Sequence, residues 1–162
     1  MTAAQKITPC LWFDGRAEEA ALFYTSIFPD SRIDRVHKAT SDYPGGKEGG
    51  VLFVEFTLAG QSYQGLNGGP HTAFNDAVSL SVSCTDQAEV DRYWEALIAG
   101  GGKPVQCGWL QDKYGLRWQI IPEPYLELMR SSHRDGVQRA MAAMMTMVKL
   151  DIAALRRAYD GA

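Results

Sequence analysis

The sequence has no cluster of basic residues, no long apolar run and no paired cysteines. Its 162 residues carry 16 Lys and Arg against 19 Asp and Glu, which argues against a nucleic-acid surface, because such surfaces gather positive charge. No apolar run approaches the roughly 20 residues of a membrane span, and the polar segment Met1–Thr8 does not fit a signal peptide. Cys10, Cys84 and Cys107 lack the spacing of a metal site, which is typical of reduced thiols in a cytoplasmic protein.

The chain is 46% hydrophobic, enough to bury the core of one domain. The residue pattern of its first half predicts a strand, a helix and three further strands, in that order. The first strand is expected within Ile7–Phe13, and the helix is expected to begin after Asp14 as N-cap and to end at Pro29. The strands that follow are expected at Ser31–Thr40, Val51–Leu58 and Gln61–Asn67, with Phe53 and Glu55 on the same face of the second of these.

The second half repeats this order. A strand at Ala77–Cys84 precedes a helix that Thr85 or Asp86 caps and that ends near Ile98. Two further strands within Cys107–Pro122 turn at Asp112–Gly115. The spacing of Phe13, Ala17 and Phe23 recurs in Cys84, Ala88 and Trp94, and Tyr63-Gln64 parallels Trp118-Gln119. We therefore predict an internal duplication and an α+β fold, in which two βαβββ modules form a cupped mixed sheet.

The remainder of the chain is predicted to be helical. Helices are expected at Tyr125–Ser131, at Gly136–Leu150 and after Asp151, which serves as an N-cap. We expect a domain at residues 1–124, with modules at about 5–70 and 76–124, and a helical C-terminal extension at 125–162. Because the tail helices have apolar faces, we also expect a homodimer.

Gln64 and Gln119 are the residues whose placement most needs an explanation. Each stands among apolar and aromatic neighbours, and an unpaired amide in a dry site costs about 1–3 kcal/mol. Each glutamine therefore either faces a concave surface or bonds to backbone groups, and both alternatives are open. The candidate ligand-binding residues are Gln64, Asn67, Cys107, Trp109, Trp118 and Gln119.

These candidates also have structural interpretations. The tryptophans fit a hydrophobic core as well as an aromatic cage. Asn67 fits a turn, and Cys107, with no His near it in the sequence, fits a buried thiol better than a nucleophile. Asp112 and Lys113 fit a turn with charged residues as well as a catalytic pair.

Several motifs resemble those of the PhnB-like family, which carries the label 3-demethylubiquinone-9 3-methyltransferase, in the vicinal oxygen chelate (glyoxalase, bleomycin resistance, dioxygenase) superfamily. They are Pro9-Cys-Leu-Trp-Phe13, Ala17-Glu-Glu-Ala20, Phe23-Tyr24, Gly60-Gln61, Asn67-Gly-Gly-Pro70, Cys107-Gly-Trp-Leu110, Asp112-Lys-Tyr-Gly-Leu116, Trp118-Gln119 and Lys149-Leu-Asp-Ile-Ala-Ala-Leu155. The resemblance implies paired βαβββ modules and, in the metal-using members, ligands on the first and last strand of each module.

The resemblance also places both glutamines. It aligns Gln119 with the last-strand carboxylate of glyoxalase-like enzymes and Gln64 with the same position of the first module. The matching first-strand positions, near Pro9 and Ala77–Leu80, hold no His, Asp or Glu. Two amides alone make a poor divalent-metal site, so we expect no metal. The glycines of Gly45–Gly50 open no predicted helix, so we expect no S-adenosylmethionine or other cofactor.

Three functions are open from the sequence. The first is a protein that binds or converts a small molecule in the sheet cleft without a metal. The second is a non-catalytic dimer that sequesters a hydrophobic or antibiotic-like compound, as bleomycin-resistance proteins do. The third is a metal-dependent lyase or isomerase with an atypical ligand set. The expected partners are a small molecule and a second copy of the chain, not nucleic acid or a membrane, and the sequence leaves open whether a reaction occurs.

Overall fold

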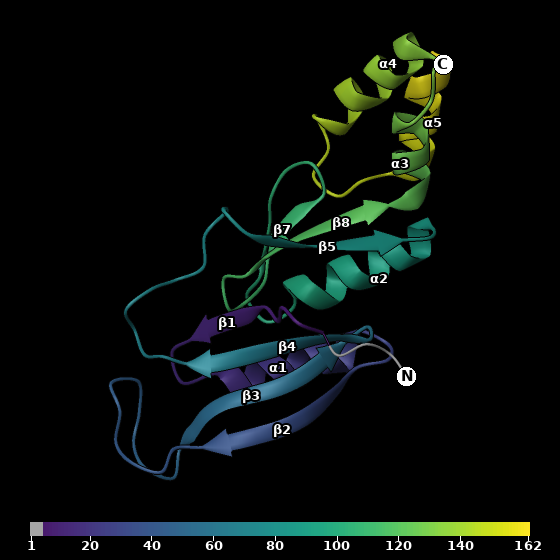
Figure 1. Cartoon of the computed structure of the whole chain (residues 1–162). Helices are drawn as coiled ribbons and strands as arrows, with labels where there is room; N and C mark the ends of the chain where they lie inside the picture. Colours follow the sequence, from purple (N-terminus) through teal and green to yellow (C-terminus); the bar gives the residue numbers. More distant parts are fainter. Residues whose placement is uncertain (1–4) are drawn as a thin grey trace. The chain divides into compact units, whose positions relative to one another are not determined.

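Two βαβββ modules make up the fold of this chain in the computed structural model, which describes residues 5–162 (Figure 1). The chain divides into two compact units, one ending at Phe74 and the other spanning Asn75–Ala162. Each unit contains one four-stranded sheet with both parallel and antiparallel pairs, and helices accompany each sheet. The predicted α+β class with paired βαβββ modules is therefore confirmed.

The first unit contains the first module. Its elements are β1 (Cys10–Phe13), α1 (Ala17–Ile27), β2 (Arg32–Lys38), β3 (Val51–Leu58) and β4 (Gln61–Asn67). The sheet order is β1-β4-β3-β2, in which β1 runs parallel to β4 and the other pairs are antiparallel. The sequence prediction gave the bounds of β3 and β4 correctly, because both strands end at clear turn residues.

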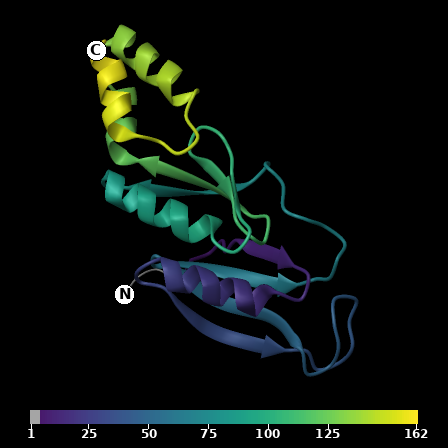
Figure 2. The ribbon, with the colours of Figure 1, turned by 180° about the vertical axis from the view of Figure 1, so that it is seen from behind.

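Helix α1 covers one face of this sheet (Figure 2). Three buried alanines, Ala17, Ala20 and Ala21, let the helix approach the strands closely. Tyr24 is fully buried, and its ring centroid lies 6.5 Å from that of Phe56 on β3. The core of the unit is therefore the α1 face of the sheet, which leaves the other face open.

The start of α1 differs from the prediction. Asp14 is not the N-cap; that position belongs to Arg16, which makes no capping side-chain bond. Gly15 adopts a φ of 75°, so the helix begins at Ala17, too far along for Asp14 to cap it. Asn67 at the end of β4 supplies the missing acceptor, because its Oδ1 accepts a 2.9 Å hydrogen bond from the Ala17 amide.

The second unit repeats the topology. Its module consists of β5 (Ser79–Cys84), α2 (Gln87–Ile98), β6 (Lys103–Pro104), β7 (Trp109–Gln111) and β8 (Arg117–Pro122), with the sheet order β5-β8-β7-β6. Strand β5 is parallel to β8. The predicted cap at Asp86 is confirmed, since its carboxylate accepts a 2.8 Å bond from the Glu89 amide.

The core of this module lies between α2 and the sheet. The side chains of α2 that face the sheet are buried, as are alternating residues of β7 and β8. The buried residues are Val90, Tyr93, Trp94, Leu97, Leu110, Trp118 and Ile120. The residues between them on β7 and β8 therefore lie on the face away from α2.

Three C-terminal helices, α3 (Glu123–Met129), α4 (Arg134–Met144) and α5 (Ile152–Asp160), complete the second unit (Figure 1). Tyr125, Leu150 and Leu155 form their buried centre. Gln87 of α2 joins the module to this region, because its Nε2 donates to the Leu150 carbonyl and its Oε1 accepts from the Ile152 amide. The division into a domain at 1–124 and an extension at 125–162 stays a prediction.

Helix α4 is shorter than predicted. The apolar spacing suggested a helix through Leu150, but α4 ends at Met144. The carbonyls of Met147 and Val148 instead accept bonds of 2.8 Å from the amides of Cys107 and Gly108. The backbone pairing with this distant loop overrides the helical pattern. Among residues 5–162, no helix is long and apolar enough to cross a membrane.

Candidate functional site

The open face of the first sheet carries a row of polar side chains across four strands. Cα pairing places Cys10 opposite Gln64, Gln64 opposite Glu55, and Glu55 opposite Arg35. Paired residues lie on the same face of a sheet, and Val54 and Phe56 on either side of Glu55 are buried on the α1 face. The row therefore faces away from α1.

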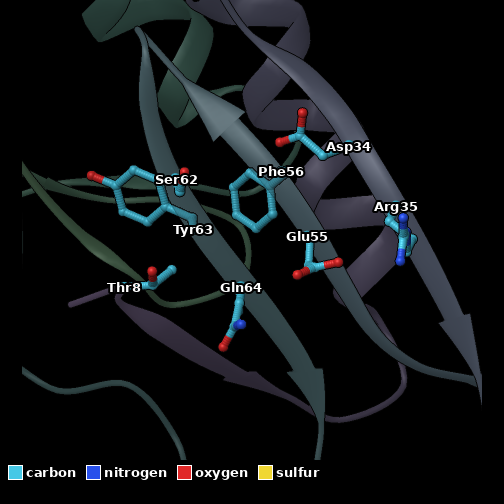
Figure 3. A pocket seen from close by; sticks show the side chains of 8 residues that line it. All are labelled: Thr8, Asp34, Arg35, Glu55, Phe56, Ser62, Tyr63 and Gln64. Carbon is cyan, nitrogen blue, oxygen red and sulfur yellow. The ribbon is translucent and has the colours of Figure 1, made fainter. Parts of the chain in front are cut away.

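A pocket of about 420 Å³ lies on this face, within the size range of small-molecule sites. Figure 3 shows the side chains that line it, contributed by β2, β3, β4 and the segment before β1. The lining residues are Thr8, Asp34, Arg35, Glu55, Phe56, Ser62, Tyr63 and Gln64. Most of them are polar, so the pocket suits a ligand with hydrogen-bonding groups better than a purely hydrophobic one.

A hydrogen bond and a ring contact hold Glu55 in place. Its Oε2 lies 2.7 Å from Nε2 of His37, and the His37 ring stacks on Phe53 with centroids 4.0 Å apart and planes 11° from parallel. The acidic pocket residue Asp34 is also bonded, since it accepts from Thr57 Oγ1 at 2.7 Å and lies 2.8 Å from Arg32 Nε. The carboxylates of the pocket therefore have defined orientations.

Other groups of the pocket are available to a ligand. Within residues 5–162, the side-chain amide of Gln64 and the guanidinium of Arg35 form no hydrogen bond or ion pair, and Oε1 of Glu55 has no partner. Cys10 adjoins Gln64 in the row, and burial raises the pKa of its thiol. The thiol is therefore neutral near pH 7 and is not an activated nucleophile.

The sheet of the second unit presents an equivalent position. The sequence repeat aligns Phe13 with Cys84; Phe13 pairs with Asn67 in the first sheet, and Cys84 pairs with Pro122 in the second. Three residues earlier on each strand, Cys10 pairs with Gln64 and Ser81 pairs with Gln119. Each glutamine thus occupies the same place in its own sheet.

The environments of the two glutamines differ. Gln119 donates from Nε2 to Ser79 Oγ at 2.8 Å and has Trp109 opposite it on β7. Glu55 occupies the corresponding place beside Gln64. The surface around Gln119 is therefore aromatic and hydroxyl-rich, whereas the surface around Gln64 is charged.

Three of the predicted ligand residues lie elsewhere. Asn67 is buried, with Oδ1 bonded to the Ala17 amide and Nδ2 donating to the Val51 carbonyl. Trp118 is also buried, and its Nε1 donates to Asp112 at 2.8 Å. Cys107 lies in the loop before β7, with its Sγ 3.9 Å from the carbonyl oxygen of Met145. Gln64 lies on the sheet face away from α1, and Gln119 and Trp109 lie on the sheet face away from α2. Ligand contact by all six residues stays a prediction.

His37, Glu55 and Arg35 were not predicted from the sequence. His37 has no sequence spacing in common with His71 or His133, so it gave no motif. The signal that could have found these residues is the two-residue alternation that puts Arg35 and His37 on one face of β2 and Phe53 and Glu55 on one face of β3. The register between the two strands was also needed, and β2 contains irregularities that the sequence does not reveal.

The donor set does not fit the divalent metal that the superfamily resemblance implies. In the part of the chain that the structure describes, no three His, Cys, Asp or Glu side chains gather in an arrangement that could hold a metal ion. The first-strand neighbours of the two glutamines are Cys10 and Ser81. Amides beside a neutral thiol and a hydroxyl are weak ligands for divalent transition metals.

Comparisons with known proteins agree with the motifs. Residues 5–121 match the family model described as 3-demethylubiquinone-9 3-methyltransferase. The solved structure of the PhnB protein from Bacillus cereus is 37% identical with a TM-score of 0.66, and the alignment covers 73% of this chain and 99% of that one. A search of curated proteins gave no significant match.

Two more distant structures share the fold. Protein PA1353 from Pseudomonas aeruginosa is 18% identical with a TM-score of 0.55, over 74% of this chain and 98% of that one. The fosfomycin resistance protein FosX from Mesorhizobium loti is 14% identical with a TM-score of 0.50, over 72% and 90%. From its motifs, its modules and the match over residues 5–121, this chain belongs to the 3-demethylubiquinone-9 3-methyltransferase family.

Proposed function

We propose that this protein binds a polar small molecule on the open face of its first sheet, without a metal. The observation that carries the proposal is the unbonded amide of Gln64 in a pocket of about 420 Å³, beside a Glu55 whose orientation His37 fixes. An amide offers two donors and an acceptor, so it recognises a ligand by hydrogen bonds. The open face around Trp109 and Gln119 in the second unit is a further predicted ligand surface.

The His37–Glu55 pair favours conversion of the ligand over simple sequestration. A carboxylate bonded to one ring nitrogen of a histidine orients the ring and leaves the other nitrogen to accept a proton. His37 is 30% exposed and Glu55 is 40% exposed, so both are accessible to a ligand. The second candidate, a non-catalytic binding protein, uses the same pocket without the proton transfer.

The methyl transfer named in the family description is not part of this proposal. Gly45–Gly50 lie in the loop between the antiparallel strands β2 and β3. A Rossmann-type nucleotide site requires a glycine-rich turn between a strand and a helix. Calorimetric titration with S-adenosylmethionine checks this point, and micromolar binding would contradict it.

The test of the proposed function is a screen of polar fragments by two-dimensional ¹H–¹⁵N NMR, followed by turnover assays on the compounds that bind. We expect the shifts to centre on Gln64 and Glu55. Gln64→Ala is expected to weaken binding about tenfold, since it removes the hydrogen bonds of the amide. Gln138→Ala is the matched control, because Gln138 is exposed on α4.

Two further variants separate conversion from sequestration. His37→Gln keeps a polar side chain but lacks the basic ring nitrogen, so it is expected to abolish turnover and to retain most of the binding. If fragments bind at Gln64 and none is converted, the non-catalytic alternative replaces the enzyme. If no polar fragment shifts the resonances around Gln64, the proposed function is wrong.

We also propose a homodimer. Met141, Met145 and Val148 are exposed apolar residues of the C-terminal region, and covering them would remove apolar surface from water. Light scattering after gel filtration tests this, and a monomer at every concentration would contradict it. Met145→Glu with Val148→Glu is expected to dissociate the dimer, whereas Gln138→Glu is expected to leave it intact.

A further inference from the structure

Arg35 and Glu55 are cross-strand neighbours of opposite charge that do not bond to each other. Their Cα positions pair between β2 and β3, and both residues line the pocket. Glu55 instead directs Oε2 to His37 at 2.7 Å. Among residues 5–162, the Arg35 guanidinium forms no ion pair. The pocket therefore holds a cation and an anion side by side, each with free hydrogen-bonding capacity.

These two groups and Gln64 follow one another across the sheet. Figure 3 shows Gln64 on β4, Glu55 on β3 and Arg35 on β2, in that order. Neighbouring strands lie about 4.8 Å apart, so the backbone positions of Arg35 and Glu55 are separated by about one strand spacing. An amide, an anion and a cation thus form a line over three strands.

The other charged groups facing this pocket do not disturb its balance. Asp34 lies 2.8 Å from the Arg32 guanidinium, so its charge is compensated locally. Glu55 and Arg35 then contribute one negative and one positive charge. A ligand with one charge would meet an opposite group and a like group on neighbouring strands, so attraction and repulsion would largely cancel.

We infer that this pocket takes a zwitterion, with the ligand's ammonium on Glu55 and its carboxylate on Arg35. Gln64 then bonds to a neutral polar part of the same molecule. Arg suits the carboxylate because its planar guanidinium donates two parallel hydrogen bonds. The inference rests on the proposed function, since it names the ligand class of the same pocket.

The test compares simple compounds of equal length by NMR titration of the full chain. The zwitterion is 4-aminobutanoate, the cation is butylamine, the anion is butanoate and the neutral control is butanamide. We expect 4-aminobutanoate to bind at least about fivefold more tightly than any of the other three, as one added charge-assisted contact predicts. Equal or tighter binding of a singly charged compound would overturn the inference.

Two variants check the assigned roles. Arg35→Gln is expected to remove the advantage of 4-aminobutanoate over butylamine, and Glu55→Gln is expected to remove its advantage over butanoate. An unchanged preference in both variants overturns the inference. The NMR spectrum of each variant shows whether it folds. If a variant does not fold, the comparison of the four compounds on the wild-type protein alone tests the inference.

The two proposals fail differently. If polar fragments shift Gln64 but zwitterions have no advantage, only the ligand class is wrong. If no fragment of any charge shifts Gln64, the pocket itself is not a binding site and both proposals are wrong.

Discussion

Gln119 donates from Nε2 to Ser79 Oγ at 2.8 Å across the parallel pair of β5 and β8. Gln64 occupies the same position in the first sheet opposite Cys10, and its amide is not bonded within residues 5–162. The duplication therefore preserves the residue type at this position and changes its use. One glutamine stabilises its own sheet, and the other is available to a ligand.

This difference predicts unequal effects on stability. Gln119→Ala is expected to lower the free energy of unfolding by about 1 kcal/mol, because it removes a hydrogen bond between side chains. Gln64→Ala is expected to change it by less than about 0.5 kcal/mol, since no contact of its amide is lost. Urea denaturation of the two variants measures both values. Equal losses would show that the Gln64 amide has a partner in the folded protein.

Asp112 is a second position where the structure decides between two interpretations. Its Oδ1 accepts from the amides of Tyr114 and Leu116, and its Oδ2 accepts from Trp118 Nε1. The residue is 1% exposed, so it closes the β7–β8 turn from within rather than acting on a substrate with Lys113.

Replacing Asp112 is therefore expected to destabilise the protein. Asp112→Ala removes the acceptor of two buried donors and one half-buried donor, and we expect a loss of about 3 kcal/mol. Asp112→Asn keeps one acceptor but directs its NH₂ at Trp118 Nε1–H, so an intermediate loss is expected. Thermal and urea unfolding check both variants, with Asp14→Asn as the control, because Asp14 is exposed and does not cap α1. A loss below about 1 kcal/mol for Asp112→Ala would contradict this role.

Local patterns predicted most elements of this fold. The alternation in Val51–Leu58, the turn at Ala59-Gly60 and the cap at Asp86 each depend on a few neighbouring residues, and each prediction is confirmed. The wrong predictions involve contacts between distant segments. Asn67 displaces Asp14 as the acceptor at α1, and the loop at Cys107 pairs with the segment after Met144.

Predicting the pocket from the sequence would also have required knowledge of contacts between distant segments. Gln64 was predicted because of the repeat, which relates two positions along the sequence. Its neighbours Glu55 and Arg35 lie on other strands, and only the register brings them into one row. A sequence pattern gives the face on which a side chain lies, but not which residue lies opposite.

The motif Asn67-Gly-Gly-Pro70 provides a further prediction. Trp12 Nε1 donates to the Gly69 carbonyl at 2.8 Å, and a Cβ on Gly68 would lie 2.2 Å from the Trp12 ring. Gly68→Ala must therefore displace the indole or the turn, and we expect a loss of about 2–3 kcal/mol. Urea unfolding measures it. The intrinsic emission, to which Trp12 is one of four contributing tryptophans, is expected to shift to longer wavelength as the Trp12 ring becomes exposed.

A matched control separates this clash from a general effect of alanine. A Cβ on Gly15 meets nothing within 4 Å, although its φ of 75° is unfavourable for alanine. Gly15→Ala is therefore expected to cost about 1–2 kcal/mol from backbone conformation alone, with the tryptophan emission unchanged. An unshifted spectrum in Gly68→Ala would contradict the predicted contact.

The cysteines are expected to differ in reactivity. Burial, with a further contribution from the Glu89 charge, raises the pKa of Cys84 to about 12. The thiolate is the reactive form of a cysteine. With a pKa of about 12, the Cys84 thiol keeps its proton up to about pH 10. Cys10 is exposed, and although burial of part of its side chain also raises its pKa, reagents reach it.

Alkylation with iodoacetamide at pH 8, followed by peptide mass spectrometry, is expected to label Cys10 and leave Cys84 unmodified, while both react in urea. Prompt labelling of Cys84 in the native protein would show that α2 and β5 open readily, because the residue is reached only when the second module loosens.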